Sequence, residues 1–165
     1  MALIGASAVA LSACGADAGS AGASAPVSDW SLVLADAKGQ TVNWYMYGGD
    51  DKLNDFVADT VKPRLAKLGI TLRQVRITDT GDAVNKVLGE KQAGRTKGGA
   101  VDAIWINGEN FATGVQAGIW SCGWAADLPN ARYVDLKNPA VSRDFGVPVK
   151  GCEAVWQQAT SVLVY

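Results

Sequence analysis

Residues 41–49 read Thr-Val-Asn-Trp-Tyr-Met-Tyr-Gly-Gly, a β-rich run that ends abruptly at a pair of glycines and therefore predicts a strand followed by a turn. Asp50 or Asp51 then offers a helix cap. Apolar residues recur at helical spacing over the next twenty positions, and Gly69 should end that helix. Pro63 has no amide hydrogen, so we expect the helix to kink or restart there.

Two further apolar patterns follow along the chain. Residues 70–77 alternate apolar and polar, which indicates a second strand, and residues 78–82 form a turn and helix cap before a short amphipathic helix that closes at Gly94. Residues 101–106 are nearly continuously apolar, as expected of an interior parallel strand, and residues 107–110 open the next helix. This βαβαβ order predicts an α/β lobe with a mostly parallel sheet and helices on both faces.

Ligands of such sheets bind at the carboxyl ends of the strands, so three loops should converge on one rim, at residues 47–51, 78–82 and 107–111. For the acids, helix capping is the competing interpretation, and the glycines can serve the turn alone. Trp105 is expected to pack in the core. The candidate ligand-binding residues of the three loops and their flanks are Tyr45, Tyr47, Gly48, Gly49, Asp50, Asp51, Thr78, Asp79, Asn107, Glu109 and Asn110.

The amino-terminal residues have a different composition. Residues 3–13 are uncharged and too few to span a bilayer, so we interpret residues 1–13 as a signal peptide. A signal peptide normally opens with Lys or Arg, and residues 1–3 have neither, so a start upstream of Met1 is the alternative. Leu11-Ser12-Ala13-Cys14 resembles the lipobox, which implies lipidation of Cys14. Residues 14–29 are then the lipidated cysteine and a flexible tether rich in Gly, Ala and Ser, and a buried Ala-rich element is the alternative for the apolar run.

Composition excludes several classes of function. The chain has 165 residues with 15 basic and 16 acidic side chains and no histidine, which leaves neither a basic footprint for nucleic acid nor His-based catalysis or metal binding. No nucleotide-binding glycine motif and no clustered carboxylates occur, so we expect no cofactor and no metal.

Two cysteines remain beside Cys14. In an exported protein, Cys122 and Cys152 are predicted to form a disulfide, and two free buried thiols are the alternative. Trp120 and Trp124 stand on either side of Cys122, and we expect both to pack around the bridge.

Several blocks carry a family resemblance: residues 101–111 (VDAIWINGENF), 128–130 (LPN), 133–135 (YVD), 48–51 (GGDD) and the motif Gly151-x-Glu153-x-x-Trp156. Together they resemble the YnjB-type solute-binding proteins of ABC importers, over residues 41–165. The resemblance implies a monomeric lipoprotein of the periplasm or the outer face of the envelope, which closes two lobes on a small solute and delivers it to a permease and its ATPase. It adds Glu153 and Trp156 to the ligand-binding candidates. The family pattern has proline where this chain has Val155, and Cys152 is unusual in that motif.

The domain organisation follows from these assignments. Residues 30–165 form the amino-terminal lobe, and the apolar run at residues 161–165 is expected to be the crossover strand into a second lobe. We expect no enzymatic activity. The alternatives are a lipid-anchored structural protein of the envelope without transport, and a carboxylate-dependent hydrolase acting through a pair such as Asp50 and Glu109.

Overall fold

The computed structural model describes residues 29–157. The predicted signal peptide, the predicted lipidation site Cys14, nearly all of the tether and the apolar run at residues 161–165 lie outside the described residues. No helix within residues 29–157 is long and apolar enough to cross a membrane.

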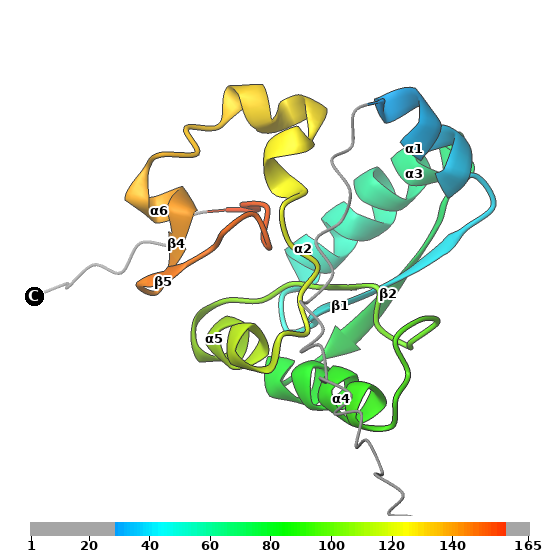
Figure 1. Ribbon diagram of the computed structural model, residues 1–165. Helices are drawn as coiled ribbons and strands as arrows, with labels where there is room; N and C mark the ends of the chain where they lie inside the picture. The colour runs from blue at the N-terminus through cyan, green and yellow to red at the C-terminus, as the bar shows by residue number, and fades with distance from the viewer. Residues whose placement is uncertain (1–28, 158–165) are drawn as a thin grey trace, which may run out of the picture.

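A parallel three-stranded sheet forms the centre of the molecule (Figure 1). Its strands are β1 (Thr41–Tyr47), β2 (Thr71–Ile77) and β3 (Ala103–Ile104), in the order β2-β1-β3. β1 and β2 pair over seven residues, from Thr41 opposite Thr71 to Tyr47 opposite Ile77. The predicted α/β class with a parallel sheet is therefore confirmed.

The prediction of a full interior strand at residues 101–106 is wrong in two respects. Only Ala103 and Ile104 form strand β3, and within the described chain β3 pairs on one side alone, so β1 is the central strand. The physical reason lies at Asp102, whose carboxylate accepts hydrogen bonds from the backbone N–H of Asn43 (2.8 Å) and from its side-chain amide (3.0 Å). That carboxylate takes the donor that a longer β1–β3 ladder would use.

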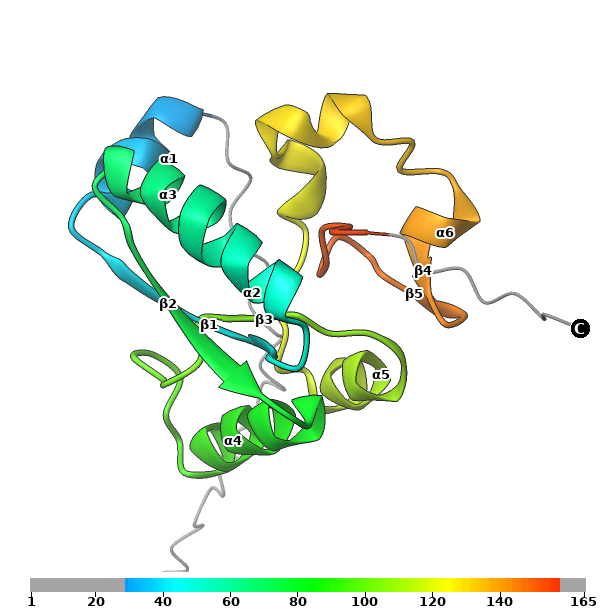
Figure 2. The ribbon, with the colours of Figure 1, turned by 180° about the vertical axis from the view of Figure 1, so that it is seen from behind.

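One face of the sheet is covered by a continuous helical segment and by α1, which lie side by side (Figures 1 and 2). The segment consists of α2 (Asp51–Phe56), a π-helical turn (Val57–Val61) and α3 (Lys62–Lys67). The backbone N–H of Lys62 bonds to Val57 O, and Pro63 follows directly. The expected kink or restart is thus a widened π turn just before the proline.

Helix α1 (Trp30–Ala37) was not predicted from the sequence pattern, because it immediately follows the Gly/Ala/Ser-rich stretch. Its N-cap is Asp29, whose carboxylate accepts hydrogen bonds from the backbone N–H (2.9 Å) and the hydroxyl (2.7 Å) of Ser31. These hydrogen bonds lower the pKa of Asp29, since they favour the charged carboxylate.

The opposite face is covered by α4 (Thr80–Gln92) and α5 (Gly108–Ala117). α4 begins at Thr80, inside the predicted turn of residues 78–82, because Asp79 already caps it. Ala83 and Val84 are buried, as its periodicity predicted.

Phe111 of α5 and Trp120 form a stacked aromatic pair in the core. Phe111 is fully buried, and its ring lies parallel to that of Trp120, with centroids 6.3 Å apart and planes 5° apart. The indole Nε1 of Trp120 donates to Phe111 O (3.0 Å). A Cβ atom on Gly114 would overlap the Trp120 ring, so glycine is required where the indole crosses the helix.

We expect Gly114→Ala to destabilise the protein by about 1–3 kcal/mol, because overpacking against Trp120 outweighs the helix propensity of alanine, worth about 1 kcal/mol. Gly89→Ala is the matched control. Gly89 lies exposed in α4 with open space around it, so its replacement should stabilise by about 0.5–1 kcal/mol. Urea unfolding of both variants measures the difference, and equal stabilisation of the two would refute the packing argument.

The remaining described chain, residues 118–157, is built of short elements that the sequence did not predict. It lies beside α2 and α5 in both ribbon views. The elements are 3₁₀ turns at Ala125–Asp127 and Pro129–Tyr133, helix α6 (Pro139–Ser142), and an antiparallel hairpin of β4 (Arg143–Asp144) and β5 (Val147–Pro148).

Candidate ligand-binding rim

The three predicted loops do meet at the carboxyl edge of the sheet. The backbone N–H of Gly48 donates to Ile77 O (3.0 Å), which fastens the loop after β1 to the end of β2. A Cβ atom on Gly81 would lie 3.5 Å from Oδ1 of Asn110, so the first turns of α4 and α5 touch. We call residues 47–51, 78–82 and 107–111 together the rim. The structure brings these loops together, and their role in ligand binding stays a prediction.

Two of the acidic candidates cap helices. Asp50 Oδ1 accepts from the backbone N–H of Leu53 (3.1 Å), and Asp79 Oδ1 accepts from that of Gly81 (2.8 Å). The competing interpretation of these acids is therefore confirmed at the level of contacts. Asp51 and Glu109 lie in the first turns of α2 and α5 with exposed side chains, and Thr78 is exposed before the Asp79 cap. All five residues are exposed, and the two caps differ in that their carboxylates already accept a backbone hydrogen bond.

Asn107 occupies the N-cap position of α5, but its side chain makes no capping hydrogen bond within the described residues. Instead, the first amide of the helix, Gly108 N–H, donates to Asp144 Oδ2 at 2.6 Å. A carboxylate from the β4–β5 hairpin thus caps the first amide of α5, next to Asn107 of the rim. Sequence reasoning missed Asp144, which lies 36 residues further along the chain.

Gly48 and Gly49 are needed in the turn because a side chain at either position would clash with a neighbouring residue. A Cβ atom on Gly48 would lie 2.6 Å from Cβ of Arg76, and one on Gly49 would overlap the phenol of Tyr47. The Tyr47 ring therefore lies over Gly49 and is 50% exposed, whereas Tyr45 is partly buried in β1. Of the two tyrosines, Tyr47 is the one a ligand at the rim could reach.

Asn54 holds this turn in place and was not predicted. Its side chain is 1% exposed, its Nδ2 donates to Gly48 O (2.8 Å), and its Oδ1 accepts from Gln74 Nε2 (2.8 Å). The only signal in the sequence is a polar residue one helical turn before the apolar Val57. Asn54 links the rim to the second strand through two partly buried hydrogen bonds.

Replacing Asn54 by leucine should lower the free energy of unfolding by about 2–3 kcal/mol, because Gly48 O and the Gln74 amide lose their buried partner. Asn85→Leu, at an exposed position of α4, is the control and should change stability by no more than about 0.5 kcal/mol. Chemical denaturation of both variants gives the comparison. Equal effects would show that the Asn54 contacts contribute nothing.

Trp156 lies in an aromatic cluster with Trp44, Phe56 and Trp105. Its ring centroid is 5.4 Å from that of Trp44, 6.3 Å from that of Phe56 and 6.4 Å from that of Trp105, with the ring planes strongly inclined. The cluster includes Trp105, which was expected to pack in the core. Trp156 itself is 44% exposed, so one part of its ring packs and the other faces outward.

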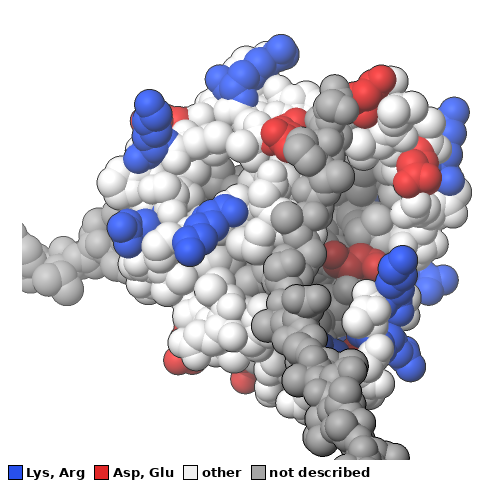
Figure 3. All heavy atoms as spheres, viewed as in Figure 1, with Lys and Arg blue, Asp and Glu red and all other residues white. Residues whose placement is uncertain are grey.

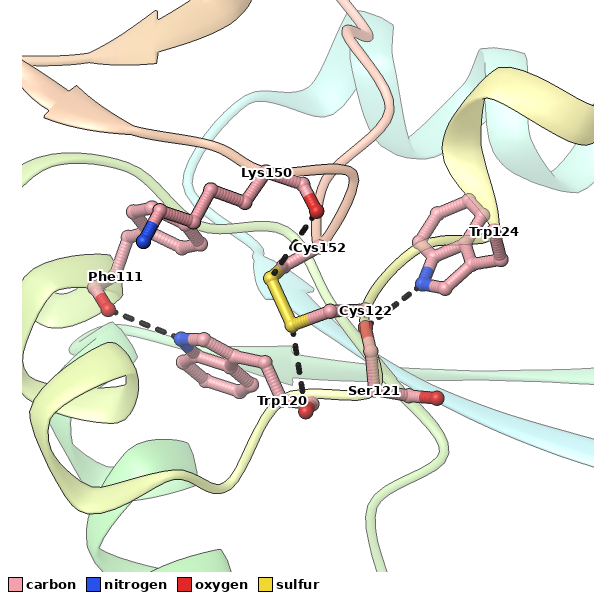
Figure 4. Close-up of a disulfide and its surroundings, with 7 residues drawn as sticks. All are labelled: Phe111, Trp120, Ser121, Cys122, Trp124, Lys150 and Cys152. Atoms are coloured by element: carbon pink, nitrogen blue, oxygen red, sulfur yellow. Dashed lines mark hydrogen bonds between the residues drawn. A yellow bond between two sulfur atoms is a disulfide. The ribbon is translucent and has the colours of Figure 1, made fainter. Parts of the chain in front are cut away.

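The Cys122–Cys152 disulfide is present, with an S–S distance of 2.00 Å (Figure 4). Trp120 and Trp124 flank it, and Trp124 Nε1 donates to Ser121 O (2.8 Å). Beside the bridge, the backbone N–H of Gly123 donates to Gly151 O (3.0 Å). The bridge ties the end of the described chain to the segment that leaves α5. Stable disulfides form in oxidising compartments, which indicates a location outside the cytoplasm.

A cavity of about 390 Å³ lies within this disulfide-linked segment. Its wall is mainly apolar, with the side chain of Glu153 among the polar exceptions. Burial, and secondarily the negative charge of Asp144, raise the pKa of Glu153 from its ordinary value of 4.5 to about 7. Burial also raises the pKa of Asp144, opposed by the hydrogen bond from Gly108 N–H. The apolar residues of the wall include Ala125, Leu128, Val134, Val141, Val149 and Val155.

The raised pKa of Glu153 predicts a pH dependence of stability. Between pH 4.5 and about 7 the folded protein retains a proton that the unfolded chain has released, so the stabilisation is complete below pH 4.5 and is lost as pH rises through about 7. Because the side chain is partly exposed, we expect a loss of only about 1–2 kcal/mol. Glu153→Gln should flatten this part of the profile, and Glu109→Gln should not. Identical profiles for both variants and the wild type would refute the assignment.

Charge and metal-binding groups complete the description of the surface. On the face shown in Figure 3, Lys and Arg side chains occur in several places, some of them close together at the lower right, with Asp and Glu on the same face. No group of three or more Asp, Glu or Cys residues between positions 29 and 157 is placed to hold a metal ion.

An α/β unit with an open parallel sheet, helices on both faces and polar loops at the carboxyl edge is consistent with one lobe of a periplasmic binding protein. The chain is 46% identical over 132 residues to Protein YnjB of Escherichia coli strain K12, of which it is therefore a homologue. The match takes in 78% of this chain and 33% of YnjB, so the chain spans about a third of the length of that relative. No protein-family model and no solved structure matches the chain.

Proposed function

We propose that this chain belongs to the extracytoplasmic solute-binding component of an ABC importer, which captures a small solute and presents it to a membrane permease and its ATPase. The observation that carries the proposal is the rim, where three polar loops gather at the carboxyl ends of parallel strands. The resemblance of residues 101–111 to YnjB-type solute-binding proteins supports the same function.

The location is part of the proposal. The disulfide favours an oxidising compartment, and a lipid anchor at Cys14 would hold the monomeric protein at the membrane, next to its permease. Binding would be coupled to transport by closure of two lobes about a hinge, which converts occupancy into a docking signal. We propose capture without chemical conversion of the solute.

The rim indicates what kind of solute to test. Asp51 and Glu109 are exposed acids at two of its loops, and Tyr47 is a half-exposed residue. Carboxylates pair with cations or accept hydrogen bonds from hydroxyl groups, and an aromatic face stacks on rings. The solute class that fits is a cationic or hydroxyl-rich small molecule.

A thermal-shift screen of the protein encoded by the complete reading frame tests the proposal, against sugars, polyamines, thiamine, amino acids and oxyanions. A ligand at 100 times its dissociation constant should add about 2.7 kcal/mol of stability and raise the midpoint by several degrees. A saturable shift without product, detected by mass spectrometry of the solute, is the expected result. Turnover of the solute would favour the hydrolase alternative, and a flat screen would favour a structural envelope protein.

Variants locate the binding. Asp51→Asn and Glu109→Gln should weaken binding of the solute that the screen finds. Asp36→Asn is the matched control, because Asp36 is an exposed acid in α1, whose connection to β1 joins the amino end of the sheet. Equal affinities of all three variants and the wild type would place binding away from the rim.

A further inference from the structure

The turn of the β4–β5 hairpin has an unusual backbone. Arg143 pairs with Pro148 and Asp144 with Val147, so Phe145 and Gly146 alone make the turn. Both have positive φ angles, 43° at Phe145 and 90° at Gly146. Two-residue hairpin turns with two positive φ angles normally have Asn, Asp or Gly at the first position. A phenylalanine in the left-handed region costs about 1–2 kcal/mol.

Packing of the Phe145 side chain offsets little of this strain energy, because the residue is 84% exposed. If the ring were buried, its packing in the core would account for phenylalanine at a strained backbone position. An almost fully exposed ring has no such packing. The stability of the described domain therefore gives no reason for phenylalanine at this position.

The hairpin nevertheless holds this ring in a defined place. Asp144 accepts the 2.6 Å hydrogen bond from Gly108 N–H, and Arg143 Nη1 donates to Gly146 O (2.9 Å) across the turn. A Cβ atom on Gly108 would lie 3.7 Å from Cδ2 of Phe145, so the edge of the ring lies over the start of α5. In both ribbon views the tip of the hairpin stands next to α5. The ring borders the rim at the loop that contains Asn107, Glu109 and Asn110.

We propose that Phe145, beside the rim, is a solute-contacting residue whose exposed ring stacks on an aromatic or sugar ring of the bound solute. The inference rests on the proposed function and narrows it to ring-bearing solutes. The ring of the solute would stack on the face of Phe145 that the hairpin leaves exposed. This contact offsets the strain energy of the turn only when solute is bound. Linear polyamines and inorganic oxyanions have no ring face to offer.

The test combines stability with binding, in the protein from the complete reading frame. The probes are glucose, thiamine and tryptophan as ring-bearing solutes, and spermidine and phosphate as ringless ones, measured by titration calorimetry. Phe145→Gly should raise the thermal midpoint by about 2–4 °C, since glycine relieves the turn, and should weaken binding of the ring-bearing solute at least tenfold. Phe145→Tyr should keep the affinity within about threefold, because it retains the ring.

Tyr133→Ser is the matched control. Tyr133 is also a largely exposed aromatic, 73% exposed, but it lies in the second 3₁₀ turn beside Arg132, and its loss should leave solute affinity unchanged. If the wild type binds a ring-bearing solute and Phe145→Gly binds it equally well, the inference is wrong and the proposed function stands. Tight binding of spermidine or phosphate alone also overturns the inference only. Saturable binding of none of the probes would overturn both.

Discussion

Replacing both bridge cysteines by serine, C122S/C152S, is expected to lower the free energy of unfolding by about 3–4 kcal/mol. The bridge closes a sequence separation of 30 residues, and the chain-entropy model assigns that much to a loop of this length. The effect is large here because the bridged segment contains only two-residue strands, short 3₁₀ turns and the four-residue helix α6, which bury little apolar surface of their own. For a domain of ordinary stability, this is a major fraction of the total.

Urea unfolding with and without reductant measures the effect. Reductant should lower the unfolding midpoint of the wild type to that of C122S/C152S and should not change the midpoint of the double variant. If the wild type is unaffected by full reduction, the bridge does not stabilise the fold by restricting the unfolded chain.

Phe111→Ala is expected to cost about 3–5 kcal/mol. Phe111 is fully buried in α5, and its ring stacks on Trp120, so alanine would leave a cavity and also remove the aromatic partner. Phe111→Leu keeps most of the volume and should cost clearly less. The Trp120 hydrogen bond is made to the backbone oxygen of Phe111, so both variants retain it.

Val115→Ala serves as the control on the same helix, because Val115 is 39% exposed and should tolerate the change within about 1 kcal/mol. Chemical denaturation followed by tryptophan fluorescence reports both stability and the environment of Trp120. A Phe111→Ala variant no less stable than Val115→Ala would contradict the packing described for α5.

The first half of the fold could be predicted because each element carries a strong period. Strand β1 follows from a β-rich run that ends at two glycines, strand β2 from the alternation of apolar and polar residues, and the helical segment between them from apolar residues at helical spacing. The rim followed in turn, since parallel strands place their carboxyl ends on one edge. The disulfide was predicted from cysteine count and compartment.

The second half could not be predicted in the same way, because its structure depends on contacts far apart in the chain. Strands of two residues have no detectable period, and the hairpin is placed by the bond between Asp144 and Gly108, 36 positions apart. The structural role of Asn54 was missed because it depends on hydrogen bonds with Gly48 and Gln74, which only the fold brings close. The φ angle that makes Phe145 unusual likewise leaves no mark in the composition of residues 143–147.

Hydrogen exchange of the complete protein, measured by mass spectrometry with and without the solute found in the screen, shows whether the solute binds at the carboxyl edge of the sheet. Solute bound at the carboxyl edge of the sheet should slow exchange in residues 47–51, 78–82 and 107–111, and in the hairpin at residues 143–148. The helices at the amino edge, α1 and the end of α3, should exchange at unchanged rates. Protection confined to that amino edge, with the rim unaffected, would contradict the assignment of the rim as the solute-binding site.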